Sequence, residues 1–149
     1  MRATSPTRVL IVAHQTADSP ALQEAVARRS SEGACTFILL VPAPFRGLHR
    51  RVDFEDHGPL EAETRLASAL PLLSRAAGQD VVGVIGSQEP LAAVQDALNL
   101  FGFDEVMISM LPAGVSRWLQ IDLPRKVRAL GVPVTEVLSE ADIPSVPTA

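Results

Sequence analysis

Five short apolar runs recur along the chain, and a longer segment with helical periodicity separates each run from the next. Apolar runs of about 4–8 residues are typical of strands that are buried on both faces of a parallel sheet. Strands that alternate with helices in this way predict an α/β domain. The five predicted strands are Arg8–Ala13, Cys35–Val41, Val81–Gly86, Glu105–Leu111 and Pro133–Leu138.

Proline and glycine mark the points where the predicted helices begin and end. A capping serine followed by proline at the first helical position is typical of a helix start, and glycine is typical of a helix end. By these signals the first helix runs from Ser19-Pro20 to Gly33 and the second from Pro59 to Gly78. Pro71 lies inside the second helix and is expected to bend or shorten it.

Two further helical segments follow in the second half of the chain. The third predicted helix has four apolar residues at helical spacing on its core face: Leu91, Val94, Leu98 and Phe101. It ends at Gly102, and a fourth helical region covers Ser116–Leu130. This last region falls into two parts, because Pro124 suits the first turn of a new helix. Asp122 is the candidate cap of that second part, and Gly131 follows its end.

Right-handed crossovers between parallel strands place helices on both faces of the sheet. The chain is therefore predicted to be a three-layer α/β/α sandwich with a five-stranded parallel sheet, as a single domain over residues 1–149. Its core spans about residues 8–138. The Pro/Ser/Thr-rich ends, Met1–Thr7 and Ser139–Ala149, are expected to be flexible.

Composition excludes several classes of protein. An apolar content of 47% excludes a disordered chain, and a single cysteine excludes a disulfide framework and a Cys-rich zinc site. A net charge of -4 argues against nucleic-acid binding, which needs a basic face. No apolar stretch approaches about 18 residues, so no membrane span is predicted and the chain is expected in the cytoplasm. Cys35 is interpreted as a buried core thiol.

Ligands of open parallel sheets bind beyond the carboxyl ends of the strands, where the strand order reverses. Three segments are therefore predicted near one crevice: Ala13–Asp18, Val41–Phe45 and Ser109–Arg117. The candidate ligand-binding residues of the first two segments are His14, Gln15, Thr16 and Val41. His14 can contact a ligand or carry a proton near neutral pH, and the alternative is a hydrogen-bonded structural histidine.

The third segment is the most distinctive stretch of the sequence, and it contains the single tryptophan, Trp118. A flexible glycine, free N–H groups at a helix start and an arginine together suit a carboxylate or a single phosphate. The candidate residues of this anion site are Ser109, Gly114, Val115, Ser116 and Arg117. The alternative interpretation is purely structural, with Ser116 as a helix cap and Trp118 packed against the sheet.

Two other candidate sites, a loop that covers a ligand or binds a metal and a Ser/His/Asp arrangement, have less support in the sequence. The polar stretch Phe45–Gly58 can be a solvated loop or a lid over an anion, and its acidic residues and histidine lack a metal-ligand spacing, so no metal site is predicted. Ser109 or Ser116 with His14 and Asp122 also suggests serine-type catalysis, but the chain lacks the Gly-x-Ser-x-Gly nucleophile turn, so no catalytic residue is assigned.

The order of strands and helices, with RVLIVAHQT at the start and GVPVTEV at the end, resembles the universal stress protein family. The resemblance covers roughly Arg8 to Leu138 and implies a sheet with strand order 3-2-1-4-5. It also implies a homodimer through the last strand, Pro133–Leu138, in which Val134, Val137 and Leu138 form an apolar edge that needs a partner.

ATP-binding members of that family carry the pattern Gly-x2-Gly-x9-Gly-Ser/Thr after the fourth strand. Glycine lets the backbone approach the phosphates, and amides at the helix start hold the anion. The corresponding positions here are Ser109, Pro112, Asp122 and Leu123, so all three glycines are absent. Pro112 has no N–H to donate, and Asp122 repels a phosphate that lies close to it.

We therefore expect a universal stress protein-like module that binds a small anionic ligand or regulates a partner. It is expected to be non-catalytic, without a cofactor and without ATP binding of the usual kind. The alternative is a nucleotide-binding stress-response protein or slow ATPase. In that case the amides from Ala113 to Arg117 surround a phosphate, and His14 or Gln15 lies near the ribose.

Overall fold

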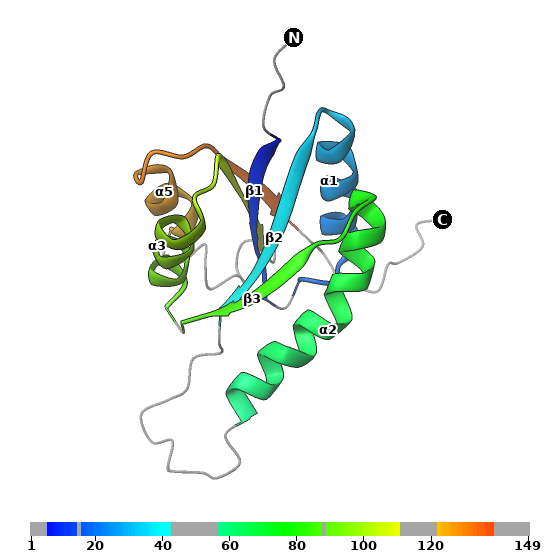
Figure 1. Cartoon of the computed structure of the whole chain (residues 1–149). Helices are drawn as coiled ribbons and strands as arrows, with labels where there is room; N and C mark the ends of the chain where they lie inside the picture. The colour runs from blue at the N-terminus through cyan, green and yellow to red at the C-terminus, as the bar shows by residue number, and fades with distance from the viewer. Residues whose placement is uncertain (1–5, 15, 43–56, 88, 111–121, 139–149) are drawn as a thin grey trace, which may run out of the picture.

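The computed structural model describes residues 6–14, 16–42, 57–87, 89–110 and 122–138 (Figure 1). Its strands are β1 (Thr7–Val12), β2 (Cys35–Pro42), β3 (Val82–Gly86), β4 (Glu105–Met110) and β5 (Val134–Leu138). Its helices are α1 (Pro20–Ser31), α2 (His57–Ala77), α3 (Pro90–Phe101) and α5 (Leu123–Arg128). All neighbouring strands are parallel, and their order is β3-β2-β1-β4-β5. The predicted fold class and strand order are confirmed.

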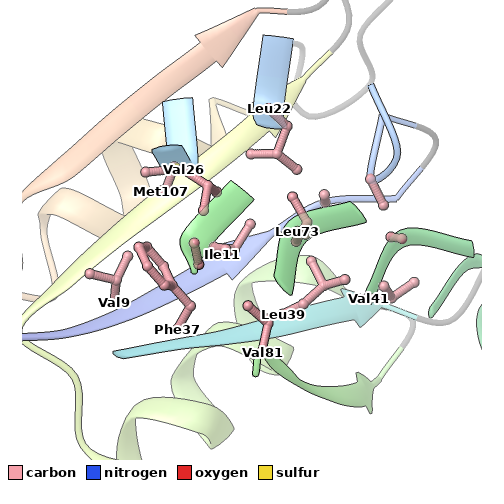
Figure 2. Packing of buried hydrophobic residues seen from close by; sticks show 14 of the residues in the cluster. Val9, Ile11, Leu22, Val26, Phe37, Leu39, Val41, Leu73, Val81 and Met107 are labelled. Atoms are coloured by element: carbon pink, nitrogen blue, oxygen red, sulfur yellow. The ribbon is translucent and has the colours of Figure 1, made fainter. Parts of the chain in front are cut away.

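In the described part of the chain, each face of the sheet carries two helices and its own core. Helices α1 and α2 cover one face, and α3 and α5 cover the other (Figure 1). Figure 2 shows the first core, in which Ile11, Leu39 and Met107 from the sheet meet Leu22 of α1 and Leu73 of α2. Alternate residues of the same strands point into the second core: Leu10, Val12, Leu40, Val106 and Ile108. The central strands are thus predominantly apolar because both of their faces are covered.

Helix α2 is longer than predicted at its amino end and is not shortened by proline. It begins at His57 rather than Pro59 and continues through Pro71 to Ala77. A proline cannot donate to the carbonyl of the residue four positions earlier, which here is Ala67. Both residues are exposed, so water can replace the missing hydrogen bond at little cost. Gly78 then ends the helix at a φ of +74°, as its position in the sequence predicts.

The face that α3 buries matches the predicted one in part, because Val94 is buried and Leu91 and Leu98 pack against the core. The buried residues are Ala93, Val94 and Ala97, whereas Leu91 and Leu98 are only partly buried and Phe101 is 38% exposed. The reason is a close approach of the helix to the end of β3. A Cβ atom placed on Gly86 would lie 2.7 Å from the Cβ of Ala93, so only small residues fit at this contact. The alanine face therefore lies against the sheet, and the larger residues lie at its margin.

Asp122 stands at the predicted cap position of the last helix, but its side chain does not cap the helix. Asp122 does precede α5, but its backbone is left-handed with a φ of +57°, and its side chain accepts no capping hydrogen bond from a backbone N–H of the helix. The carboxylate Oδ2 instead lies 3.3 Å from Nη1 of Arg125. A left-handed residue turns its side chain away from the N–H groups of the first turn, which a capping residue in the β region would reach. Residues 116–121 of the predicted helix lie outside the described residues.

An ion pair at the amino end of the sheet was not predicted from the sequence. Nε and Nη2 of Arg29, in the last turn of α1, lie 3.1 and 3.0 Å from the two carboxylate oxygens of Glu105 at the start of β4. Both side chains are largely buried, and the hydrogen bonds to Glu105 raise the pKa of the Arg29 guanidinium. Cys35 lies nearby in the core, as predicted, and burial raises the pKa of its thiol. Helix α1 is thereby fixed to β4.

Within the described ranges, no helix is both long and apolar enough to cross a membrane. In the same part of the chain, no three histidine, cysteine or acidic side chains gather as metal ligands would. The stretch 45–56, with its candidate lid arginines and acidic residues, lies outside the described residues.

Candidate functional site at the ends of β1 and β4

The strand order reverses between β1 and β4. From β1 the chain crosses to β2 by way of α1 on one face, whereas the segment after β4 returns to β5 by way of α5 on the other face. Val12 at the end of β1 is in register with Ile108, so Ala13 and Ser109 follow side by side at the carboxyl ends of the two strands. This is the switch point at which ligands of such sheets bind.

A pair of buried hydroxyl groups joins the two sides of the switch point. Oγ1 of Thr16, in the β1–α1 turn, lies 2.5 Å from Oγ of Ser109 on β4. The two residues are 2% and 1% exposed. The side chain of Ser109 belongs to the α1 and α2 face of the sheet, because Met107 on the same strand and Val137 next to it point into that core. Two of the predicted ligand residues are therefore brought together, 93 positions apart in the sequence.

The two hydroxyl groups of this pair carry two hydrogens, and their mutual bond uses one of them. Each hydroxyl can donate one hydrogen and accept at its lone pairs. In a mutual bond one hydroxyl donates to the other, so the acceptor still carries its own hydrogen. No described residue supplies an acceptor for that second hydrogen. Buried polar groups are satisfied in most native proteins, so this O–H is a candidate donor to a ligand or to an ordered water.

Backbone hydrogen bonds hold Thr16 in position. The N–H of Ala17 donates to the His14 carbonyl at 3.2 Å, and the N–H of Ser19 donates to the Thr16 carbonyl at 3.0 Å. Upstream, the N–H of Ala13 donates to Leu40 of β2 at 3.2 Å and so extends the sheet by one residue. The backbone of Thr16 is thus held by a hydrogen bond from Ser19, and the residue that follows it is held by a bond to His14.

The start of α1 does not provide an anion site. Pro20 has no N–H, the N–H of Leu22 donates to the Ser19 hydroxyl at 3.1 Å, and the N–H of Gln23 donates to the Ser19 carbonyl at 3.1 Å. The predicted cap and N1 proline are therefore confirmed. The two bonds occupy the amides of Leu22 and Gln23, which are therefore not available to an anion.

The other predicted ligand residues have different surroundings. His14 is half-buried, and its Nε2 atom is shielded from solvent. Val41 is fully buried and packs in the core of the α1 and α2 face (Figure 2). Gln15 and the segment Gly114–Arg117 lie outside the described residues, so their roles stay predictions.

Serine-type catalysis has no geometric basis in the described part of the chain. The hydroxyl of Ser109 is bonded to Thr16, and the carboxylate of Asp122 is bonded to Arg125. A nucleophile, base and orienting acid have to be bonded to one another in that order. The Thr16–Ser109 pair itself was not foreseen as a pair. The only signal in the sequence was a hydroxyl residue at the carboxyl end of each of two adjacent strands.

Comparison of the sequence with known proteins finds no matching family model and no curated protein with a significant match. Comparison of the structure does find matches. A universal stress protein from Archaeoglobus fulgidus is similar with a TM-score of 0.63 and 13% sequence identity, over 88% of this chain and 93% of that one.

Several of the similar structures contain a nucleotide. A universal stress protein in complex with cAMP has a TM-score of 0.56 and 17% identity, over 89% of this chain and 98% of that one. A universal stress protein family protein from Arabidopsis thaliana with AMP bound has a TM-score of 0.56 and 15% identity, over 92% and 94% of the two chains. With its five parallel strands in the order 3-2-1-4-5, this chain has the fold of the universal stress proteins.

Proposed function

We propose that this chain is a universal stress protein that binds a small anionic ligand at the ends of β1 and β4 and acts as a regulatory module without catalysing a reaction. The observation that carries the proposal is the buried Thr16–Ser109 pair, in which one hydroxyl hydrogen has no acceptor among the described residues. Hydrogen bonds to a charged acceptor are about twice as strong as neutral ones. A carboxylate or phosphate oxygen is therefore the acceptor that this position favours.

The sequence beyond β4 is consistent with an anion smaller than a nucleotide. Arg117 supplies a positive charge eight positions after Ser109, and Ser116 supplies a further hydroxyl. Pro112 cannot donate a backbone hydrogen bond to a phosphate chain. The glycines that ATP-binding members of the family carry are missing at Ser109, Pro112 and Asp122.

Nucleotide binding is the second candidate function, and one observation favours it. Two structurally similar proteins contain AMP or cAMP. In this candidate function the chain is a nucleotide-binding stress-response protein or a slow ATPase. The two candidates differ in the ligand that stabilises the wild-type protein and in the release of phosphate from ATP.

Calorimetry and thermal unfolding separate the two candidates. We expect inorganic phosphate or succinate at millimolar concentration to stabilise the protein, and AMP, ADP and ATP to leave its melting temperature unchanged. A ligand at about 100 times its Kd adds about 2.7 kcal/mol of stability, which is readily measured. The fluorescence of Trp118, the single tryptophan, provides a second readout of the same titrations.

Matched variants link the ligand to the proposed position. Ser109→Ala and Thr16→Val each remove one hydroxyl of the pair and should weaken the binding of phosphate or succinate. Thr36→Val is the control, because it removes an exposed hydroxyl near the opposite end of β2. Stabilisation by nucleotides alone would favour the second candidate. The absence of any response to either kind of ligand would refute binding at this position.

The proposed module is a homodimer paired along β5. This strand forms one edge of the sheet, and its exposed apolar side chains need a partner. Leu138 is 52% exposed and Val134 is half-buried, but Val137 points into the core and does not contribute to the edge. The strand also begins at Val134 rather than at Pro133. The cytoplasmic location stays a prediction from the sequence.

A further inference from the structure

Strand β3 forms the edge of the sheet opposite β5, and no described segment pairs with its outer side (Figure 1). Two of its apolar side chains are exposed, Val82 at 56% and Ile85 at 38%. The strand has the sequence Val-Gly-Val-Ile-Gly, without a charge or a proline. Edge strands of soluble proteins are usually protected by a charge, a proline or a bulge, because an apolar edge with free N–H and C=O groups accepts a further strand. The edge of β3 lacks the first two protections.

We propose that the edge of β3 binds a second copy of this chain, with the two β3 strands antiparallel about a twofold axis at Val84. In this register Val82 lies opposite Gly86 of the second copy, and Ile85 lies opposite Gly83 of the second copy. The two Val84 residues face each other at the axis. Opposite residues of antiparallel strands point to the same face of the sheet with their Cβ atoms about 4.5–5.5 Å apart. Each exposed side chain therefore lies opposite a residue that has no side chain.

The surroundings of Gly83 suit the isoleucine of the second copy. Methyl groups of two α2 residues lie over this glycine: Cδ2 of Leu66 is 2.6 Å and Cδ1 of Leu70 is 3.0 Å from the position that a Cβ atom on Gly83 would take. Ile85 of the second copy, on the same face of the sheet, would pack against these two leucines. Burial of apolar surface in this contact favours association.

The surroundings of Gly86 suit the valine of the second copy in the same way. The Cβ atom of Ala93 lies 2.7 Å from the position that a Cβ atom on Gly86 would take, on the α3 face. Val82 points to this face, because its neighbour in register is Ile38, which packs against the α3 and α5 core. A register shifted by two residues loses the fit, since it places either two Gly83 residues opposite each other or Val82 beyond the end of the paired strand.

The association through β3 is expected to be weak and separate from the proposed β5 dimer, since the two strands lie at opposite edges of the sheet. Only the five residues of β3 pair in each copy, and small interfaces are typical of transient complexes. Two acidic residues, Asp80 and Glu89, flank the paired region and approach each other across the axis. Their repulsion is screened by salt, so the association should strengthen as salt is added.

Cysteine cross-linking tests the register directly, on a Cys35→Ala background. Val84→Cys places two thiols opposite each other, within the Cα separation of about 4.4–6.8 Å that a disulfide needs. Val82→Cys is the matched control, because this position is exposed but lies about 14 Å along the strand from its counterpart in the second copy. At about 1 mM protein, oxidised glutathione should convert Val84→Cys to a covalent dimer at least about fivefold faster than Val82→Cys.

Light scattering provides a second test, on a Leu138→Glu background that breaks the proposed β5 pairing. This protein should be a monomer at about 10 µM and associate reversibly at about 1 mM. Adding Val82→Lys should abolish the association, because an ammonium group would lie in the apolar contact beside Ala93 of the second copy. Leu100→Lys is the control, since it introduces the same charge at a 75% exposed position on α3 and should leave the association unchanged.

Pairing through β3 is refuted if folded Val84→Cys forms a covalent dimer no faster than Val82→Cys. If Val84→Cys does not fold, Val82→Lys decides the matter, and an association equal to that of Leu100→Lys refutes the pairing equally. Neither measurement involves a phosphate, succinate or nucleotide ligand, and neither requires the β5 pairing. A failure of the proposed function therefore leaves both results unchanged.

Discussion

Replacement of Gly86 by alanine tests whether α3 packs as closely on the sheet as the structure requires. The added Cβ atom would lie 2.7 Å from the Cβ of Ala93 and 2.8 Å from Cδ1 of Leu40. The Leu40 methyl can rotate away, but the Cβ of Ala93 moves only if the helix moves. Overpacking of this kind costs about 1–3 kcal/mol, so we expect Gly86→Ala to lose about 2 kcal/mol of its free energy of unfolding.

Two other glycines calibrate this value. A Cβ atom on Gly83 would lie 2.6 Å from Cδ2 of Leu66 and 3.0 Å from Cδ1 of Leu70, both of which are the ends of flexible side chains, so a smaller loss is expected. Gly33 has no atom within 4 Å of such a Cβ and no unusual φ. Alanine there should be neutral or stabilise the protein by about 0.5 kcal/mol, through the entropy of the unfolded chain.

Urea and thermal unfolding followed by circular dichroism measure these differences. For a chain of this size 1 kcal/mol corresponds to about 2–4 °C, so Gly86→Ala should melt roughly 4–8 °C below the wild type. The expected order of stability is Gly33→Ala, then Gly83→Ala, then Gly86→Ala. If Gly86→Ala were as stable as Gly33→Ala, the close contact between α3 and β3 would be refuted, and with it the explanation of the alanine face.

Three further predictions concern the ion pair, the sheet edge and the thiol. Arg29→Met should cost about 1.5–3 kcal/mol in urea unfolding, because the carboxylate of Glu105 loses charged hydrogen bonds in a largely buried position, and a stability equal to that of the wild type would contradict the pairing. Leu138→Glu should produce a monomer in light scattering, whereas Leu100→Glu, at a 75% exposed position on α3, should leave the dimer intact. Burial raises the pKa of the Cys35 thiol, so on raising the pH the unfolded chain loses its thiol proton before the folded protein does. The free energy of unfolding should therefore fall as the pH rises above about 8.5. Cys35→Ala should remove this pH dependence.

The sequence predicted those parts of the fold that depend on local patterns. Apolar runs locate the strands because both faces of the sheet are covered, and Gly78 and Gly102 end their helices with positive φ values. The core face of α3 was predicted only in part, because the burial of Ala93 depends on its contact with Gly86, which belongs to a different element.

The candidate site was predictable only as a set of positions. The topology placed Thr16 and Ser109 at the same edge, but their hydrogen bond joins residues 93 positions apart and depends on the exact course of the β1–α1 turn. Periodicity carries no information about such a contact. The same holds for Arg29 and Glu105, which lie 76 positions apart and give no local signal in the sequence.

Helix α1 and the turn before it are joined to β4 at two points of unequal strength. The ion pair between Arg29 and Glu105 holds the carboxyl end of the helix, and the Thr16–Ser109 bond holds the turn that precedes its amino end. A neutral hydrogen bond contributes about 1 kcal/mol, and a bond to a charged group about 1.5–3 kcal/mol, so the turn should open first, with the ion pair as the fixed end. Amide hydrogen exchange tests this order. Ser109→Ala should accelerate exchange at the N–H groups of Ala17 and Ser19 and leave the last turn of α1 unchanged. Equal acceleration along the whole helix would mean that α1 detaches as one body and that the two links do not differ in strength.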